Sequence, residues 1–193
     1  MKSFKISSDL KTYISKIDIL RSLIRYQNCL RNVNESVAEH SFYVAAIILK
    51  LYEYYNFDLE TALVTALIHD IPECEISDIP HPIKERNKDL MEIVDRIEIK
   101  TITNILSEDA AELLKHFNNG DTIEGLICQL ADILSVIVYA SDELKSGNKV
   151  FNYIAIKSLN RVYEVTNKLE TVIKEPYTKE AISNIINQIV NIY

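Results

Sequence analysis

Four side chains that can bind a metal ion stand in otherwise apolar stretches of the sequence. His40 falls in the apolar stripe of a predicted helix, and His69 and Asp70 end the run ALVTALIHD. Asp132 is the one charged residue in LICQLADILSVIVYA. A buried, unpaired carboxylate is costly, so Asp132 must be neutralised, paired with a base or bound to a cation.

Basic residues that could pair with Asp132 are scarce in the same part of the chain. Lys and Arg are absent from residues 51–83 and 116–144. Two imidazoles and two carboxylates can satisfy one another through one divalent ion, and this ligand set suits Mn, Fe, Co, Mg or Ni, or Zn with fewer ligands. The alternative is that each histidine is a hydrogen-bonded core residue and that Asp132 accepts from a hydroxyl or a backbone N–H. Spacing alone leaves both interpretations open.

Helices must position these residues, because apolar side chains recur at intervals of three and four almost throughout. Candidate N-caps are Asp9, Ser36 (with Glu39 as a capping box), Asp58 and Asp121 or Thr122. The predicted helices are 10–24, 36–55, 59–70, 88–106, 108–116, 122–146, 149–174 and 178–192. The irregular segments are residues 25–35 and a long loop at 71–84, which holds three of the four prolines. We therefore predict an all-α bundle of about seven or eight helices, forming one domain over residues 1–193.

Composition narrows the function classes. The chain has 193 residues, of which 48% are apolar and 25% charged, and only 3 are glycines, too few for a β-sandwich. The net charge of −7, with no basic block, makes a nucleic acid or an anionic membrane an improbable partner. The start MKSFKISSDLK lacks the apolar core of a signal peptide, and no uncharged stretch is long enough for a bilayer span. Three cysteines without a C-x-x-C motif indicate free thiols, so we predict a cytoplasmic protein.

The order His40, His69–Asp70, Asp132 resembles the H…HD…D pattern of the HD-domain metal-dependent phosphohydrolases. Longer segments resemble their bacterial 5′-deoxynucleotidase branch: RY at 25–26, ESVAEHS at 35–41, HDIPE at 69–73, DIPHPIK at 78–84 and LADIL at 130–134. The likeness covers residues 18–150, whereas 151–193 match only as helices. It implies a single HD-domain bundle.

The resemblance also implies roles for individual residues. The implied metal ligands are His40, His69, Asp70 and Asp132. The implied substrate contacts are Arg25, Tyr26, Asp78, Ile79, Pro80 and His81, and the implied catalytic residues are Arg25, Glu73 and Asp78. A guanidinium offers a fork of donors to a phosphate, and the carboxylates of Glu73 and Asp78 could order a water or protonate a leaving group. Without the family pattern, these three residues would be interpreted as a solvated arginine, a loop acid and a turn former.

Two features separate this chain from the nucleotidase pattern. Tyr26 stands where that branch has tryptophan, and Arg31 lies nearby as a substitute or additional phosphate contact. His81 and His116 lack ligand-like neighbours, so we expect one divalent metal ion.

The function that follows is hydrolysis of a deoxynucleoside 5′-monophosphate to a deoxynucleoside and phosphate. The alternatives are a dNTP triphosphohydrolase, a nuclease or cyclic-nucleotide phosphodiesterase, and a helical nucleotide-binding or scaffold protein without catalysis. Since relatives are commonly dimers, a homodimer is expected.

Overall fold

The computed structural model describes residues 8–79, 83, 86–173 and 184. Within these ranges seven helices have ten residues or more, and the predicted all-α class is confirmed. They are α1 (Leu10–Ser22), α2 (Val37–Leu51), α3 (Leu59–Ile68), α6 (Lys88–Ile105), α7 (Glu108–Asn119), α8 (Ile123–Lys145) and α9 (Asn152–Val172). Two short elements accompany them, α4 (Glu73–Ile76) and the 3-10 helix η1 (Lys149–Phe151). The helix predicted at 178–192 lies outside the described residues.

Local capping chemistry determines where the helices begin. The capping box of α2 is confirmed: Ser36 Oγ accepts from the Glu39 N–H, and the Glu39 carboxylate accepts from the Ser36 N–H. Asp9 and Asp58 cap α1 and α3 as predicted. Thr122 rather than Asp121 is the N-cap of α8, because its hydroxyl accepts from the Gly125 N–H at 3.1 Å.

Several predicted boundaries were wrong, for local reasons. Helix α2 ends at Leu51 rather than Tyr55, because the Glu53 and Tyr54 N–H groups donate to carbonyls three positions back and form turns. Helix α7 continues to Asn119 and ends where Gly120 adopts a left-handed φ of 59°. The predicted helix 149–174 is divided into η1 and α9, and the predicted loop 71–84 contains α4, which starts directly after Pro72.

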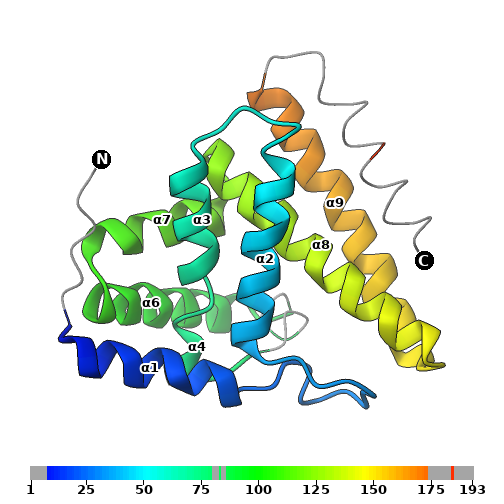
Figure 1. Ribbon diagram of the computed structural model, residues 1–193, viewed down its shortest axis with the longest axis horizontal. Helices are drawn as coiled ribbons and strands as arrows, with labels where there is room; N and C mark the ends of the chain where they lie inside the picture. The colour runs from blue at the N-terminus through cyan, green and yellow to red at the C-terminus, as the bar shows by residue number, and fades with distance from the viewer. Residues whose placement is uncertain (1–7, 80–82, 84–85, 174–183, 185–193) are drawn as a thin grey trace.

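Helix α8 is the centre of the packing. Figure 1 shows it running diagonally behind α2, with α9 alongside, and it also packs against α3 and α7. By length and composition alone α8 could cross a membrane, but most of it is buried inside the protein, as expected of a core helix. At its first turn, a Cβ on Gly125 would lie 2.5 Å from the His116 carbonyl oxygen, so glycine permits the close approach of α7.

A second apolar cluster lies beside this core. It joins α1, the start of α2, the end of α3, α6 and α7 through residues such as Leu20, Val37, Ile68, Ile102 and Leu114. The start of α2 and the end of α3 therefore lie between two packed clusters, and this packing holds the side chains there in place. The extent of the domain over residues 1–193 stays a prediction.

Candidate metal centre and nucleotide site

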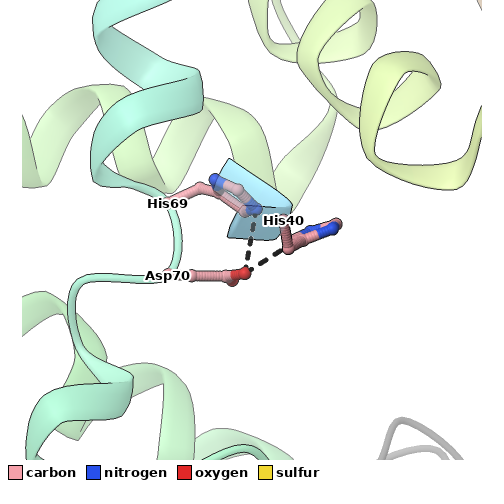
Figure 2. Close-up of side chains that lie close together, drawn as sticks. All are labelled: His40, His69 and Asp70. Carbon is pink, nitrogen blue, oxygen red and sulfur yellow. Dashed lines mark ion pairs between the residues drawn. The ribbon is translucent and has the colours of Figure 1, made fainter. Parts of the chain in front are cut away.

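Three helices bring the four predicted metal ligands to one place. His40 lies in the first half of α2, His69 and Asp70 follow the last residue of α3, and Asp132 lies near the middle of α8. His40 Nε2 is 3.1 Å from Asp132 Oδ1 and 3.5 Å from Asp70 Oδ2. His69 Nε2 is 3.2 Å from the same Asp70 oxygen, and Figure 2 shows the two contacts that Asp70 makes with the imidazoles. The ligand atoms of His40, His69 and Asp70 all lie within 4.8 Å of one another.

The inner nitrogens of both imidazoles lack hydrogen bonds although they are buried. His40 and His69 are 0% and 5% exposed, and their Nε2 atoms have no hydrogen-bond partner of acceptable geometry among the described residues. Buried polar atoms are normally satisfied, so an exception requires an explanation. Two imidazole nitrogens facing two carboxylates form the donor set of a divalent ion, and these residues therefore fit one.

The outer nitrogens of the same rings are held by hydrogen bonds that determine the tautomer. Ser135 Oγ donates to the Asp132 carbonyl at 2.8 Å, so it must accept from His40 Nδ1 at 2.9 Å. His69 Nδ1 lies 2.7 Å from the Ala66 carbonyl, which can only accept. Both neutral rings therefore carry hydrogen on Nδ1 and direct the Nε2 lone pair inward, as a metal ligand requires.

The charges of the cluster favour a cation. Burial and the nearby Arg25 guanidinium lower the pKa of His40 to about 4. Burial also opposes charge on His69, but the Asp70 carboxylate outweighs it and raises the pKa of His69 to about 9. Burial opposes ionisation of Asp132, yet its contact with His40 brings its pKa down to about 2, and His69 lowers the pKa of Asp70 in the same way. Two ionised carboxylates thus face the imidazoles, and a bound divalent ion would replace the proton on His69.

Arg25 lies beside this cluster at the base of the irregular segment. Its side chain is only 14% exposed, and its Nη1 is 3.4 Å from Glu35 Oε2. The Arg25 N–H also donates to the Glu35 carbonyl at 2.9 Å, so backbone and side chain hold the same pair together. Burial raises the pKa of Glu35 to about 7. The Arg25 guanidinium opposes this shift, and the negative charges of Glu39, Asp132 and Asp70 add to it. Glu35 belongs to the site, although sequence reasoning assigned it no role.

Tyr26 has a strained backbone and a half-buried side chain whose hydroxyl is buried. Its φ is 57°, an uncommon value for a bulky non-glycine residue and one that marks functional positions. Its ring stacks on Tyr139 at 4.9 Å between centroids and meets the edge of Phe151. The Tyr26 hydroxyl is buried without a hydrogen-bond partner in the described part of the chain.

The loop after α3 approaches Tyr26 from the other side. Asp78 Oδ2 accepts from the Tyr26 N–H at 3.2 Å, which links the two segments predicted to contact substrate. Glu73 begins α4, donates its N–H to the Asp70 carbonyl at 3.1 Å and has a buried Oε2. Ile79 is half-buried, and Pro80 and His81 lie outside the described residues.

Two further predictions concern Arg31 and His116. Arg31 Nη1 donates to the Tyr26 carbonyl at 3.1 Å and its Nε to Asn34 Oδ1 at 2.9 Å, so it holds the loop together. His116 contacts Asp121 at 2.7 Å at the end of α7 and is not one of the residues that surround the metal cluster.

Sequence reasoning missed a polar stripe along α8. Asp132, Ser135, Tyr139 and Glu143 follow one another at intervals of three and four, and so share a face of the helix. Ser135 interrupts the apolar run of α8 in the same manner as Asp132, and this signal could have found it. Glu143 stands in the charged run SDELK, so only its helical spacing from Asp132 places it on the same face. The stripe begins at the metal cluster and ends at residues 26–33, which are part of the irregular segment between α1 and α2.

Comparisons with known proteins identify relatives of this chain. Residues 12–180 match the family described as "5′-deoxynucleotidase YfbR-like". A curated 5′-deoxynucleotidase of Photorhabdus laumondii is 30% identical over 153 residues, which are 72% of this chain and 77% of the relative.

Solved structures have the same fold. A conserved hypothetical protein of Pyrococcus furiosus superposes with a TM-score of 0.70 at 26% identity, over 92% of this chain and 99% of its own. The HD phosphohydrolase DatZ of cyanophage S-2L, bound to dA and one catalytic Zn²⁺, superposes with a TM-score of 0.68 over 96% of this chain and 98% of its own. At 14% identity it shows the fold alone.

Proposed function

The chain belongs to the YfbR-like 5′-deoxynucleotidase family, and from this premise we propose that it hydrolyses deoxynucleoside 5′-monophosphates to deoxynucleosides and inorganic phosphate. The observation that carries the proposal is the pair of buried Nε2 atoms of His40 and His69, which face Asp70 and Asp132 without hydrogen-bond partners among the described residues. A metal ion can activate a phosphate ester for attack by water, and this donor set can hold one.

We further propose that His40, His69, Asp70 and Asp132 hold one divalent ion, which is Mn, Co, Mg, Fe, Ni or Zn. When bound, the ion supplies Lewis-acid chemistry, because it polarises the phosphate ester and acidifies a water molecule. Ser135 and the Ala66 carbonyl keep the imidazoles in the tautomer that binds it.

Arg25 is proposed to bind the phosphate of the substrate. Its guanidinium is mostly buried beside the cluster, so charge-assisted hydrogen bonds to a phosphate would be strong there. Glu35 holds the guanidinium through a long contact, 3.4 Å between Arg25 Nη1 and Glu35 Oε2. Because this contact is long, an incoming phosphate can replace Glu35 as the partner of Arg25.

The remaining proposed roles concern proton transfer and the nucleoside. Glu73 and Asp78 follow the ligands His69 and Asp70 in the chain. A carboxylate there can order the attacking water or protonate the leaving 5′-oxygen. The buried Tyr26 hydroxyl has no hydrogen-bond partner in the described ranges, and a hydroxyl of the sugar could satisfy it. Ile79, Pro80 and His81 are proposed to complete the contact with the nucleoside.

The test begins with protein stripped of metal. It is supplied in turn with Mn²⁺, Co²⁺, Ni²⁺, Mg²⁺, Fe²⁺ and Zn²⁺ and assayed for phosphate release from deoxy- and ribonucleoside monophosphates. The proposal expects metal-dependent phosphate release from dNMPs and little from dNTPs. Release of triphosphate from dNTPs would identify a triphosphohydrolase instead. Absence of turnover with every metal, together with a metal-dependent rise in melting temperature, would indicate a non-catalytic binding protein.

We also propose that the enzyme is a cytoplasmic homodimer whose partner is a small nucleotide, not a nucleic acid or a membrane. The net charge of −7 and the three cysteines without a disulfide support this environment. Phe42, Leu49 and Tyr52 are exposed along one side of α2 and offer an apolar face for a second copy. Light scattering should give about twice the chain mass of 22.2 kDa, whereas the mass of a single chain at micromolar concentration would exclude the dimer.

A further inference from the structure

Glu143 is a fully buried carboxylate that takes no part in the chemistry proposed above. It lies in the last two turns of α8 and is 0% exposed. Its oxygens accept from the Asn32 N–H at 2.8 and 2.9 Å, from the Val33 N–H at 2.8 Å and from Asn148 Nδ2 at 2.6 Å. A buried charge is tolerated when donors surround it, and here two of the donors belong to the irregular segment between α1 and α2.

Neighbours of Glu143 hold the same segment. The Tyr139 hydroxyl donates to the Val33 carbonyl at 2.5 Å. Asn148 Nδ2 donates to the Leu30 carbonyl at 2.9 Å, and Asn32 Nδ2 donates to Ser146 Oγ at 2.7 Å. The backbone of Leu30, Asn32 and Val33 is therefore attached to the C-terminal end of α8 and to Asn148 just beyond it.

The segment held in this way begins at Tyr26, one of two non-glycine residues with a positive φ in the described part of the chain, the other being Ser77. A left-handed backbone at a residue such as Tyr26 persists only where its surroundings over-determine it. The Tyr26 carbonyl accepts from Arg31 Nη1 and from the Cys29 N–H at 2.9 Å, so the position of Tyr26 depends on residues 29–31. Its ring stacks on Tyr139, from the same face of α8 as Glu143.

We propose that Glu143 is a positioning residue, which fixes the segment 26–33 against α8 so that Arg25 and Tyr26 are preorganised to receive the nucleotide. This inference rests on the proposed function, because it assigns Arg25 and Tyr26 to substrate binding. Glu143 contacts neither the metal ligands nor the reacting atoms, so its effect reaches substrate affinity and leaves the metal centre unchanged.

The main test is Glu143→Gln, which keeps the shape of the side chain but removes the charge and turns one acceptor into a donor. We expect KM for a dNMP to rise roughly tenfold, because misplaced binding groups lose part of their interaction. We expect kcat and bound metal per chain to stay within about twofold of the wild-type values, because the part of α8 around Asp132 is unchanged. The matched control is Asp142→Asn, which removes one charge from an exposed neighbour on the same helix and should change none of these quantities.

Amide hydrogen exchange separates this inference from the proposed function. The Asn32 and Val33 amides should exchange at least about tenfold faster in Glu143→Gln, while amides around Asp132 keep their protection. A gentler variant, Tyr139→Phe, keeps the ring on Tyr26 and removes the hydroxyl, so it should raise KM by a smaller factor than Glu143→Gln. It serves as the test if Glu143→Gln folds poorly.

Each outcome decides the matter. A KM within twofold of wild type in both variants overturns the positioning role, even if the two amides exchange faster. Loss of metal or of kcat with KM unchanged overturns it as well. A wild-type protein that is inactive on every dNMP refutes the proposed function and, with it, the effect on substrate, whereas the exchange rates still decide whether Glu143 holds the segment.

Discussion

Asp132 and Glu143 are carboxylates on one face of the same helix, but their surroundings differ. Asp132 is partly open, with a 20% exposed side chain, and the imidazole nitrogen beside it has no hydrogen bond to any residue that the structure describes. Glu143 is closed to solvent and accepts from two backbone amides and an asparagine amide. Buried polar groups whose hydrogen bonds are all satisfied within the protein stabilise one arrangement of the chain. Groups whose hydrogen bonds are not satisfied remain available for a ligand. The difference assigns the chemistry to one end of α8 and the organisation of the binding segment to the other.

Removing the open carboxylate should have the largest effect. Asp132→Ala is expected to abolish metal loading and to lower kcat/KM by roughly 1,000-fold or more, because the charge stabilisation supplied by a metal amounts to several kcal/mol. Metal content is measured by elemental analysis after dialysis, and turnover by phosphate release. Circular dichroism checks that the variant is folded, and Asp142→Asn is the control for lost charge. A variant that keeps full metal content and full rate would refute the assignment.

Removing the phosphate-binding group should have the next largest effect. Arg25→Ala is expected to raise KM by roughly 30- to 100-fold while metal content is unchanged, because two charge-assisted hydrogen bonds are lost. Arg25→Lys should lie between it and the wild type, since lysine keeps the charge without the planar fork. Equal KM values for the three proteins would show that another residue holds the phosphate.

Substitution of a residue that holds a metal ligand in place should have a smaller effect still. Ser135→Ala removes the hydroxyl that accepts from His40 Nδ1, so the ring is free to adopt the wrong tautomer. Metal affinity is expected to fall roughly 10- to 100-fold. Titration with Zn²⁺ in a competing chelator measures it, and turnover should recover at high metal concentration. Failure to recover with excess metal would mean that Ser135 acts on the reaction itself.

The remaining prediction is a dependence on pH. His69 has a pKa of about 9 in the metal-free protein, above its ordinary value near 6.5, so protonated His69 stabilises the fold below pH 6.5. This contribution declines as the pH rises through 9, and the melting temperature of the metal-free protein should fall over that window.

The same proton competes with the metal. The apparent Kd for the ion should therefore decrease by about tenfold per pH unit between pH 7 and 9, as expected for the release of one proton. Chelator-buffered titrations at three pH values measure the slope. A flat profile would show that His69 is neutral before the metal binds.

Sequence reasoning succeeded where the determining interactions are local. The Ser36–Glu39 capping box lies within four consecutive residues, and an isolated charge in an apolar helix is visible at Asp132 without any knowledge of the fold. The ends of helices were less accurate, as at Leu51, because turn residues and helix residues differ little there in side-chain type.

The interactions that could not be predicted join distant parts of the chain. Ser135 meets His40 across 95 positions, and Glu143 meets Asn32 across 111. Periodicity gives the face on which such a residue lies, but the partner is set by the packing of α2 and the irregular segment on α8. Tyr26 also has no sequence signal for its left-handed backbone, because that conformation is imposed by Asp78, Arg31 and the Tyr139 ring.

The shared polar face of α8 fixes the spacing between the metal cluster and the residues that hold the segment 26–33. Glu143 follows Asp132 by eleven positions, a rise of about 16 Å that is set by backbone geometry. Substitutions within α8 that keep its length leave this spacing intact. A single-residue insertion between the two acids would instead turn one of them about 100° around the helix axis and uncouple recognition from hydrolysis.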